Sequence, residues 1–399
     1  MTERLYYNEA YLRTFDAAVT RVDVIGGRTS IVLDRTAFYP TSGGQPFDTG
    51  VLVGETRLQV VDVVDDDSGD VVHIVDSGPE AVTPGQSVRG SVDWPRRFDH
   101  MQQHTGQHVL SAAIDRLFGV RTVSFHLGAE SSTIDLSREL TRDELVSAEV
   151  EANTIVFEDR PVGVRFVTAE EAGSLPLRKE PVRGGTLRLV DVDRFDLSAC
   201  GGTHVARTGA IGIIAVGSTE RFKGGQRIEF FCGGRALTEF RSMRDALASS
   251  GCLLSVTAHK MPQAIEKLQL ESRERQRSML SLQQELARYR AEELAASAER
   301  LPKGRLVARA VDADAVGLKS MASAIVARPG YIAVLVSTTK PALVVVARSE
   351  DVNMAANQVI ATLTAMFGGR GGGKPDLAQA GSLVADPAAI LEAARNAIS

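Results

Sequence analysis

The stretch WPRRFDHMQQHTGQHVLSAAI, residues 94–114, decides how the middle of this 399-residue chain folds. Pro95 stands near its start and apolar residues recur at helical spacing, a pattern that predicts one helix. His104 and His108 are four residues apart, so their imidazoles lie on one face of that helix and can reach a common point. Taken alone, such a pair predicts little, because helical histidines at this spacing are more often packed or solvated than bound to a metal.

A second cluster, CGGTH at residues 200–204, offers the ligands that the helix lacks. Thiolate together with imidazole is a donor set that suits zinc, and the glycines allow a turn that closes on the helical pair. Only seven His and three Cys occur in the chain, so the coincidence of the two patterns predicts a site for Zn2+. Its predicted ligands are His104, His108, Cys200 and His204. The two pairs lie much further apart than the roughly dozen residues that separate the pairs of an ordinary zinc finger.

His100, His126 and the other two cysteines are weaker candidates for zinc ligands. His100 shares the helix face with the predicted ligands and is either a third helical ligand or a group that supports them. It ranks below them because the second cluster already completes a tetrahedron. His126, in a β-rich run, is expected to be a packed core histidine, and Cys232 and Cys252 are expected to be small core residues.

Composition and charge narrow the class of protein. A hydrophobic content of 44% over 399 residues is enough for two or three domains with buried cores. No apolar run approaches the roughly 18 residues of a membrane span, and the first residues lack the features of a signal peptide. Three cysteines without disulfide-like spacing suit a reducing compartment. We therefore expect a cytoplasmic protein without a membrane partner.

The net charge of −5 is unevenly distributed. Residues 255–399 hold 18 Lys+Arg against 14 Asp+Glu, whereas residues 1–254 hold 27 against 36. A phosphate-contacting surface is therefore expected in the C-terminal part. A solvated helix face would give the same count.

Four segments are expected along the chain, which give a multidomain protein of β and α/β classes. Residues 1–93 carry short β-rich runs between turns such as Gly26-Gly27, which favours a small β-barrel. Residues 94–250 mix helices and strands and form an α/β domain. Residues 255–300 form one long helix whose apolar seam fits a coiled coil, although its polar middle also fits a helix packed on its own chain. Residues 303–399 form a C-terminal α/β domain.

Two glycine-rich loops stand out. In the barrel segment, Gly43 and Gly44 would let the backbone approach a ligand, and Thr41 and Gln45 offer hydroxyl and amide groups. An ordinary turn between two strands would account for the same sequence. The second loop, GGRGGGKPD at residues 368–376, lacks the Ser or Thr of a nucleotide-binding loop and follows a predicted helix, which excludes that function.

Arg370 and Lys374 in the second loop, together with many backbone N–H groups, suit a phosphate backbone. A plain linker is the alternative.

Together these motifs resemble a known family. FYPTSGGQP at residues 38–46, HTGQH at 104–108 and CGGTH at 200–204 are similar to the editing half of alanyl-tRNA synthetase. GGGKPDLAQAG at residues 371–381 resembles that enzyme's C-terminal domain, which is related to the DHH phosphoesterase-associated module. Because the barrel begins almost at Met1, no synthetase core is expected upstream. The chain thus resembles the long form of the free-standing alanyl-tRNA editing proteins, the AlaX type.

The resemblance implies a zinc-dependent hydrolase that deacylates mischarged Ser-tRNA(Ala), and in some cases Gly-tRNA(Ala), in trans. It implies a homodimer formed through the long helix and the C-terminal domain. The implied zinc ligands are the four residues named above. The implied catalytic residues are Gln45, His104, His108 and Cys200; the implied substrate-binding residues are Thr41, Gly43, Gly44 and Gln45; the implied tRNA-binding residues are Arg370 and Lys374.

The chemistry of the implied reaction leaves alternatives open. Zinc can lower the pKa of bound water and polarise an ester carbonyl, yet four protein ligands would close the site like a structural one. Either one ligand is loose, or water takes the fourth position and one of the four residues only supports the others, or zinc mainly orients the substrate while Gln45 or a ribose hydroxyl handles the water. A hydrogen bond from Thr41 to the serine hydroxyl would favour serine over alanine. The alternative function is a tRNA-binding accessory protein with a structural zinc and no turnover.

Overall fold

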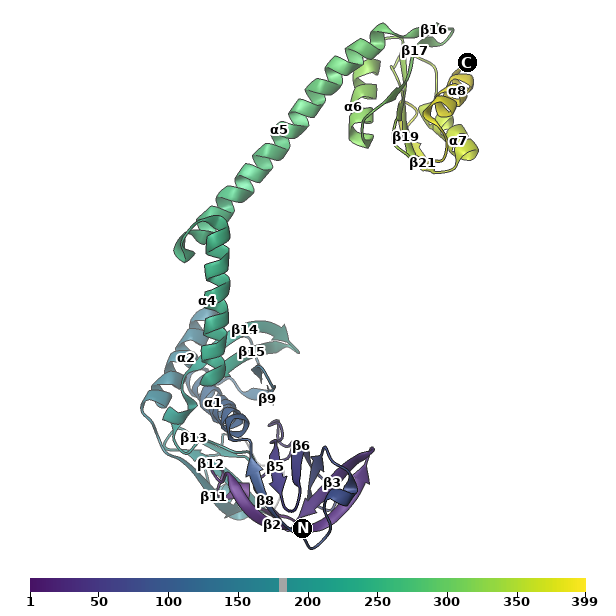
Figure 1. Ribbon diagram of the computed structural model, residues 1–399. Helices are drawn as coiled ribbons and strands as arrows, with labels where there is room; N and C mark the ends of the chain where they lie inside the picture. Colours follow the sequence, from purple (N-terminus) through teal and green to yellow (C-terminus); the bar gives the residue numbers. More distant parts are fainter. Residues whose placement is uncertain (179–184) are drawn as a thin grey trace. The chain divides into compact units, whose positions relative to one another are not determined.

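The structure is a computed structural model that describes residues 1–178 and 185–399 (Figure 1). The chain divides into two compact units, Met1–Ser249 and Ser250–Ser399. No helix in the described ranges is long and apolar enough to cross a membrane.

The first unit begins with a closed six-stranded antiparallel barrel in the order β2-β3-β7-β6-β5-β8. Its strands are β2 (Thr14–Ile25), β3 (Arg28–Leu33), β5 (Gly50–Val53), β6 (Arg57–Asp65), β7 (Val71–Val75) and β8 (Ser87–Val92). Two short strands, β1 (Glu3–Arg4) and β4 (Arg35–Thr36), pair beside it. Gly26 and Gly27 both have positive φ, +58° and +79°, which a two-residue hairpin turn between β2 and β3 requires. The predicted barrel is confirmed.

The rest of the first unit is built around α1 (Trp94–Phe118), which carries the two helical histidines. Asp93 accepts a hydrogen bond from the Arg96 amide at the start of α1, and Gly119 ends the helix with a φ of +63°. The second helix, α2 (Arg142–Phe157), opens with a capping box formed by Thr141 and Glu144, a short-range sequence pattern.

Two sheets complete the first unit. One has four antiparallel strands in the order β14 (Ile214–Phe222), β15 (Gly225–Cys232), β10 (Ser132–Leu136) and β9 (Thr122–Leu127). The other has three in the order β11 (Val162–Thr168), β12 (Thr186–Val192) and β13 (Asp196–Ala199). The remaining helices are α3 (Ala169–Gly173) and α4 (Gly234–Leu254), which reaches the unit boundary.

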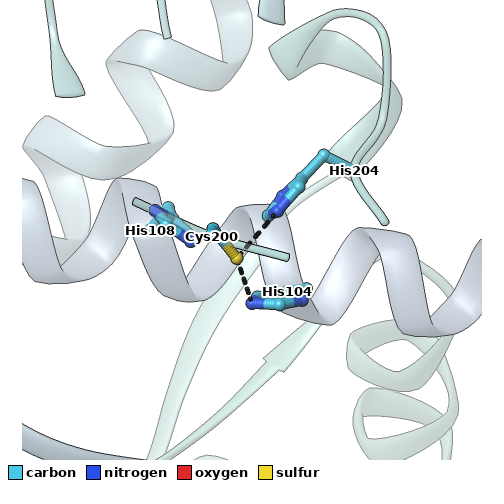
Figure 2. A group of neighbouring side chains, drawn as sticks. All are labelled: His104, His108, Cys200 and His204. Carbon is cyan, nitrogen blue, oxygen red and sulfur yellow. Dashed lines mark hydrogen bonds between the residues drawn. The ribbon is translucent and has the colours of Figure 1, made fainter. Parts of the chain in front are cut away.

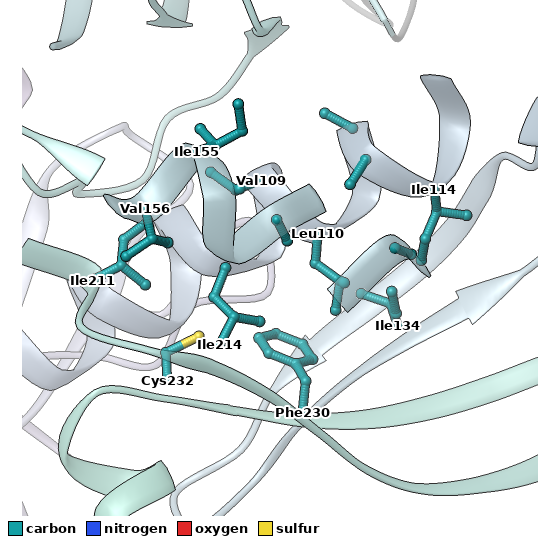
Figure 3. Packing of buried hydrophobic residues seen from close by; sticks show 14 of the residues in the cluster. Val109, Leu110, Ile114, Ile134, Ile155, Val156, Ile211, Ile214, Phe230 and Cys232 are labelled. Carbon is teal, nitrogen blue, oxygen red and sulfur yellow. The ribbon is translucent and has the colours of Figure 1, made fainter. Parts of the chain in front are cut away.

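One apolar core holds α1, α2 and the four-stranded sheet together (Figure 3). Val109, Leu110 and Ile114 come from α1, while Ile155 comes from α2 and Phe230 from β15. All five are at most 1% exposed. Burial of such side chains stabilises a fold by roughly 1.5–3 kcal/mol each, so this core fixes the position of α1 and of the histidines on its other side.

The second unit contains α5 (Met261–Ala296) and a six-stranded sheet. The sheet order is β16 (Glu299–Leu301), β17 (Gly304–Val311), β18 (Tyr331–Ser337), β19 (Ala342–Arg348), β21 (Leu377–Leu383) and β20 (Arg370–Gly373). Three further helices are α6 (Ala315–Val326), α7 (Ala356–Phe367) and α8 (Pro387–Ile398). Every residue of β18 is buried, because α5 and α6 cover one face of the sheet and α7 and α8 the other.

Three expectations from the sequence were wrong. Arg370–Gly373, predicted as part of a loop, forms the edge strand β20 paired with β21. His126 is exposed, because it lies on the edge strand β9. Cys252 is exposed near the end of α4, whereas Cys232 is buried as expected.

Candidate metal centre

Four side chains from two distant parts of the first unit converge at one point. His104 and His108 project from α1, while Cys200 and His204 come from the turn that follows β13 (Figure 2). One ligand atom of each lies within 4.8 Å of the others. Cys200 Sγ is 3.3 Å from Nε2 of His104 and 3.3 Å from Nε2 of His204. These separations are close to the roughly 3.5 Å expected between sulfur and nitrogen ligands of tetrahedral zinc.

The ring of His104 is held by Gln45. His104 Nδ1 lies 2.8 Å from Gln45 Oε1, and that oxygen also accepts a hydrogen bond from the backbone N–H of Thr203. An amide oxygen can only accept, so Nδ1 carries the proton and Nε2 presents its lone pair. Gln45 Nε2 donates to Thr203 Oγ1 at 2.8 Å, which fixes the orientation of the amide itself.

The ring of His108 is held in the same way by Asp196. His108 Nδ1 lies 2.9 Å from Asp196 Oδ2. The carboxylate also accepts hydrogen bonds from Arg178 at 2.6 Å and from Ser198 at 3.0 Å. A carboxylate behind a histidine is the usual arrangement for a metal ligand, because it fixes the ring and strengthens its donor nitrogen.

The ring of His204 is held by Thr105. The Thr105 hydroxyl donates to Met101 O at 2.8 Å, and His204 Nδ1 lies 3.3 Å from the same Oγ1. Since the hydroxyl proton is already committed, His204 Nδ1 must donate, and its Nε2 is left to ligate. In its neutral form, each of the three imidazoles thus presents an unprotonated Nε2 to the cluster, which is the chemistry that a zinc site needs.

The electrostatics of the cluster favour the thiolate. Burial raises the pKa of the Cys200 thiol, but the imidazoles of His104 and His204 outweigh it and hold that pKa well below its ordinary value. The thiolate is the form of cysteine that binds metals. Burial lowers the pKa of His108, whereas the hydrogen bond to Asp196 and the proximity of Cys200 raise it to about 9. Burial lowers the pKa of His204 to about 3.

A cavity of about 240 Å³ adjoins the cluster. Gly43, His108 and Cys200 are among the residues that line it, together with Gln107, Phe125 and Arg178. Cys200 is the only one of the four clustered side chains that is not fully buried. The cavity therefore reaches the cluster on the side of the thiol.

The glycine-rich loop of the barrel lies against this cavity. Gly44 has a φ of +84°, and a Cβ placed on it would lie 2.7 Å from the ring of Phe125. The backbone N–H of Leu127 donates to Gly44 O at 3.2 Å, so the loop is tied to β9. Beyond the glycines, Asp48 forms a fully buried ion pair with Arg97 of α1. The loop is thus fixed at both its glycine turn and its far end.

The predicted site residues occupy different places around this centre. Gly43 lines the cavity, whereas Gln45 is fully buried behind His104 and Thr41 is exposed on the loop. His100 is buried but does not join the four ligand atoms, and burial lowers its pKa to about 4. Arg370 and Lys374 are exposed at the edge of the second unit's sheet.

Sequence reasoning missed Asp196, Arg178, Thr105 and Gln107. One signal pointed to the first of them. Asp196 and Ser198 precede Cys200 with the alternation of a strand, which places them on one face. The contacts of Arg178 and Thr105 arise only from the tertiary fold.

Models of three families match parts of the chain. Residues 3–96 match the model described as tRNA synthetases class II (A). Residues 187–229 match the threonyl and alanyl tRNA synthetase second additional domain, and residues 303–399 match the DHHA1 domain. The predicted C-terminal domain of the DHH-associated type is thereby confirmed.

Two kinds of relative resemble the chain. Alanine–tRNA ligases of Pyrococcus abyssi and Halorubrum lacusprofundi are 36% and 37% identical to it, over 95% and 96% of its length. The chain spans only 42% of each ligase. The alanyl-tRNA editing protein AlaX-L of Pyrococcus horikoshii is 30% identical over 99% of this chain and 98% of its own length. The chain belongs to the family of this alanyl-tRNA editing protein.

Proposed function

We propose that the chain hydrolyses the ester bond of mischarged Ser-tRNA(Ala) in trans, at a zinc ion held by the four clustered side chains. Gly-tRNA(Ala) is the second proposed substrate. The observation that carries the proposal is the convergence of Cys200 and three imidazoles, each ring oriented with Nε2 inward, beside a cavity of about 240 Å³. A full-length relative that is named an alanyl-tRNA editing protein supports it.

The cofactor has a defined role in this proposal. When bound, zinc supplies a Lewis acid that polarises an ester carbonyl and lowers the pKa of water. Gln45, Asp196 and Thr105 contribute by fixing the three rings before any ligand arrives. Such preorganisation is valuable in catalysis, because no reorientation is needed when charge develops.

The cavity limits the substrate. Its volume of about 240 Å³ lies below the range of roughly 300–1,000 Å³ typical of drug-sized ligands. It suits a small amino acid on the end of a larger molecule. We propose that Thr41, Gly43 and Gly44 border the aminoacyl end, and that Gln45 acts through His104.

The second unit supplies the proposed partner contacts. Arg370 and Lys374, both exposed, are proposed to contact phosphates of tRNA(Ala). The exposed seam of α5 is proposed to form a homodimer together with the C-terminal sheet domain. Its large apolar members, Ile265, Leu268, Met279, Leu282 and Leu286, are each 46–65% exposed, a pattern that favours burial against another helix.

A second function is favoured by one feature. Four protein ligands complete a tetrahedron, which is the mark of a structural zinc site. In that case the chain would bind tRNA(Ala) without hydrolysing it.

One experiment separates the two functions. Metal analysis of the purified chain is combined with deacylation assays on Ser-, Gly- and Ala-tRNA(Ala). Hydrolysis of the seryl or glycyl form with sparing of the alanyl form supports editing. Binding of tRNA and zinc with no hydrolysis supports the accessory function and contradicts ours.

A further inference from the structure

The cavity beside the candidate metal centre is lined by a side-chain acceptor that the roles above leave unused. Gln107 lies between the two helical ligands on α1, is 3% exposed and lines the cavity. Its amide nitrogen donates to Ser111 Oγ at 2.8 Å. Within residues 1–178 and 185–399 its amide oxygen receives no hydrogen bond. This oxygen is not among the fully buried side-chain atoms that lack a partner in the described residues, so it is accessible to a molecule bound in the cavity.

The donors that surround the cavity do not serve this oxygen. The hydroxyl donors of the lining are bound to other neighbours: Thr122 donates to Ser111, Ser124 to Asp135 and Ser198 to Asp196. The Arg178 guanidinium donates to Asp196 and Ser198. These lining side chains thus bind one another or their neighbours, whereas Gln107 Oε1 has no partner among the residues that the structure describes and can meet a bound molecule.

The orientation of this amide is fixed. Ser111 Oγ holds the amide nitrogen of Gln107 and also receives the Thr122 hydroxyl at 2.8 Å. Because nitrogen and oxygen of an amide lie on opposite sides, anchoring the nitrogen directs the oxygen away from Ser111. The same cavity wall contains His108, the next residue on α1.

We propose that Gln107 Oε1 accepts a hydrogen bond from a donor group of the aminoacyl ester that occupies the cavity. The inference rests on the proposed function and names the side chain that recognises the amino acid. Two donors lie near the scissile bond of such a ligand: the α-ammonium of every amino acid and the β-hydroxyl of serine. A ligand whose donor pairs with this oxygen gains a hydrogen bond that a ligand without the donor lacks, so either contact makes Gln107 a determinant of binding.

Two variants separate recognition from structural support. Gln107→Met keeps the length of the side chain but removes the acceptor. Ser111→Ala removes the anchor of the amide nitrogen and keeps the acceptor. The probe is 3′-deoxy-3′-(L-serylamino)adenosine, which carries an amide in place of the ester, and binding to the zinc-loaded chain is measured by calorimetry. Its glycyl counterpart is measured in parallel.

We expect Gln107→Met to weaken binding of the seryl probe by about 5- to 50-fold, the range for one lost hydrogen bond to a neutral or charged donor. Ser111→Ala should weaken it by less than about threefold, because the acceptor remains. Zinc content and thermal midpoint should match those of the parent chain in both. A loss confined to the seryl probe identifies the hydroxyl as the donor, and an equal loss for the glycyl probe identifies the ammonium.

A third variant keeps the inference testable if Gln107→Met does not fold. Gln107→Glu retains an acceptor oxygen at the same position and should keep most of the affinity. The inference would be overturned if Gln107→Met bound the seryl probe as tightly as the parent, or if Gln107→Met and Ser111→Ala lost equal affinity. It would also be overturned if Gln107→Glu lost as much affinity as is expected for Gln107→Met. Hydrolysis of Ser-tRNA(Ala) by the parent chain is measured separately. Its absence would reject the proposed function, whereas parent hydrolysis with unchanged probe binding would reject only the role of Gln107.

Discussion

The amide oxygen of Gln45 lies 2.8 Å from Nδ1 of His104, and this contact joins the barrel loop to the face of α1 that carries the clustered histidines, across 59 residues of sequence. It places Gln45, which the resemblance implies to be a substrate-binding residue, behind the ring of His104. Its role there is to fix which nitrogen of the ring faces the thiol. The candidate metal centre is therefore supported by the barrel as well as by the segments that carry the four clustered side chains.

Removal of this contact should weaken zinc binding. Gln45→Met leaves His104 Nδ1 without its acceptor, and loss of such an outer contact typically costs about 10- to 100-fold in metal affinity. The measurement is competition for zinc with a chromophoric chelator. Gln59→Met, at an exposed position of β6, is the matched control. Parent-like affinity in Gln45→Met would show that the contact does not orient the ligand.

Neutralising Asp196, which contacts His108, should also weaken zinc binding. In Asp196→Asn the carboxylate can no longer serve both His108 and Arg178, so we expect about a 10- to 100-fold loss of zinc affinity. Zinc content after dialysis against a series of buffered zinc concentrations measures it. Asp193→Asn, in the adjacent turn, should bind zinc like the parent, and equal losses in the two variants would argue for a general charge effect.

Gly44 should tolerate no side chain. Gly44→Ala combines a left-handed φ of +84° with a Cβ 2.7 Å from Phe125, and we expect a destabilisation of about 2–3 kcal/mol. Gly43→Ala has a φ of +55° but open space around the Cβ, so it should lose only about 1 kcal/mol. Urea unfolding compares them. In a Phe125→Leu background, the difference in unfolding free energy between Gly44→Ala and Gly43→Ala should become smaller. If it stays the same, the clash with Phe125 is not its cause.

The barrel should lose stability in mild acid because of His73. This residue is fully buried, with Nδ1 3.0 Å from Ile31 O and Nε2 2.8 Å from Thr36 Oγ1. Burial lowers its pKa from 6.5 to about 4, against a smaller opposing effect of the Ile31 contact. Between pH 6.5 and about 4, His73 is therefore protonated in the unfolded chain but remains neutral in the folded chain. Stability falls as pH drops, by about 3 kcal/mol once pH reaches 4.

Urea unfolding at pH 7, 5.5 and 4.5 tests this pH dependence. The fluorescence of Trp94, the chain's single tryptophan, reports the unfolding of the first unit, in which it lies. A His73→Gln variant should show a shallower decline with falling pH than the parent. His126→Gln, at an exposed position, should decline like the parent. Identical slopes in His73→Gln and the parent would rule out His73 as the source.

Local signals in the sequence determined much of this fold. The capping box at Thr141 and the turn at Gly26-Gly27 are short-range patterns, and the structure contains both. The four clustered side chains were predictable as a set, because few residue types bind zinc and the spacing on α1 brings two of them together. Such features depend on neighbours along the chain.

Other features depend on contacts between segments that the assembled fold brings together. The glycines of β20 have little tendency to form a strand, and they pair because β21 offers an edge. His126 is exposed because β9 is the last strand of its sheet. The support of His108 by Asp196 and Arg178 joins segments 88 residues apart. No periodicity within one segment predicts such contacts.

The most direct test of the central claim is the rate of Ser-tRNA(Ala) deacylation by zinc-loaded and metal-stripped forms of the chain and by Cys200→Ala, with Cys252→Ala as the control cysteine. The account predicts turnover by the zinc-loaded parent and by Cys252→Ala, and loss of both zinc and turnover in Cys200→Ala. Turnover that persists in the metal-stripped parent or in Cys200→Ala, or its absence from the zinc-loaded parent, would contradict it.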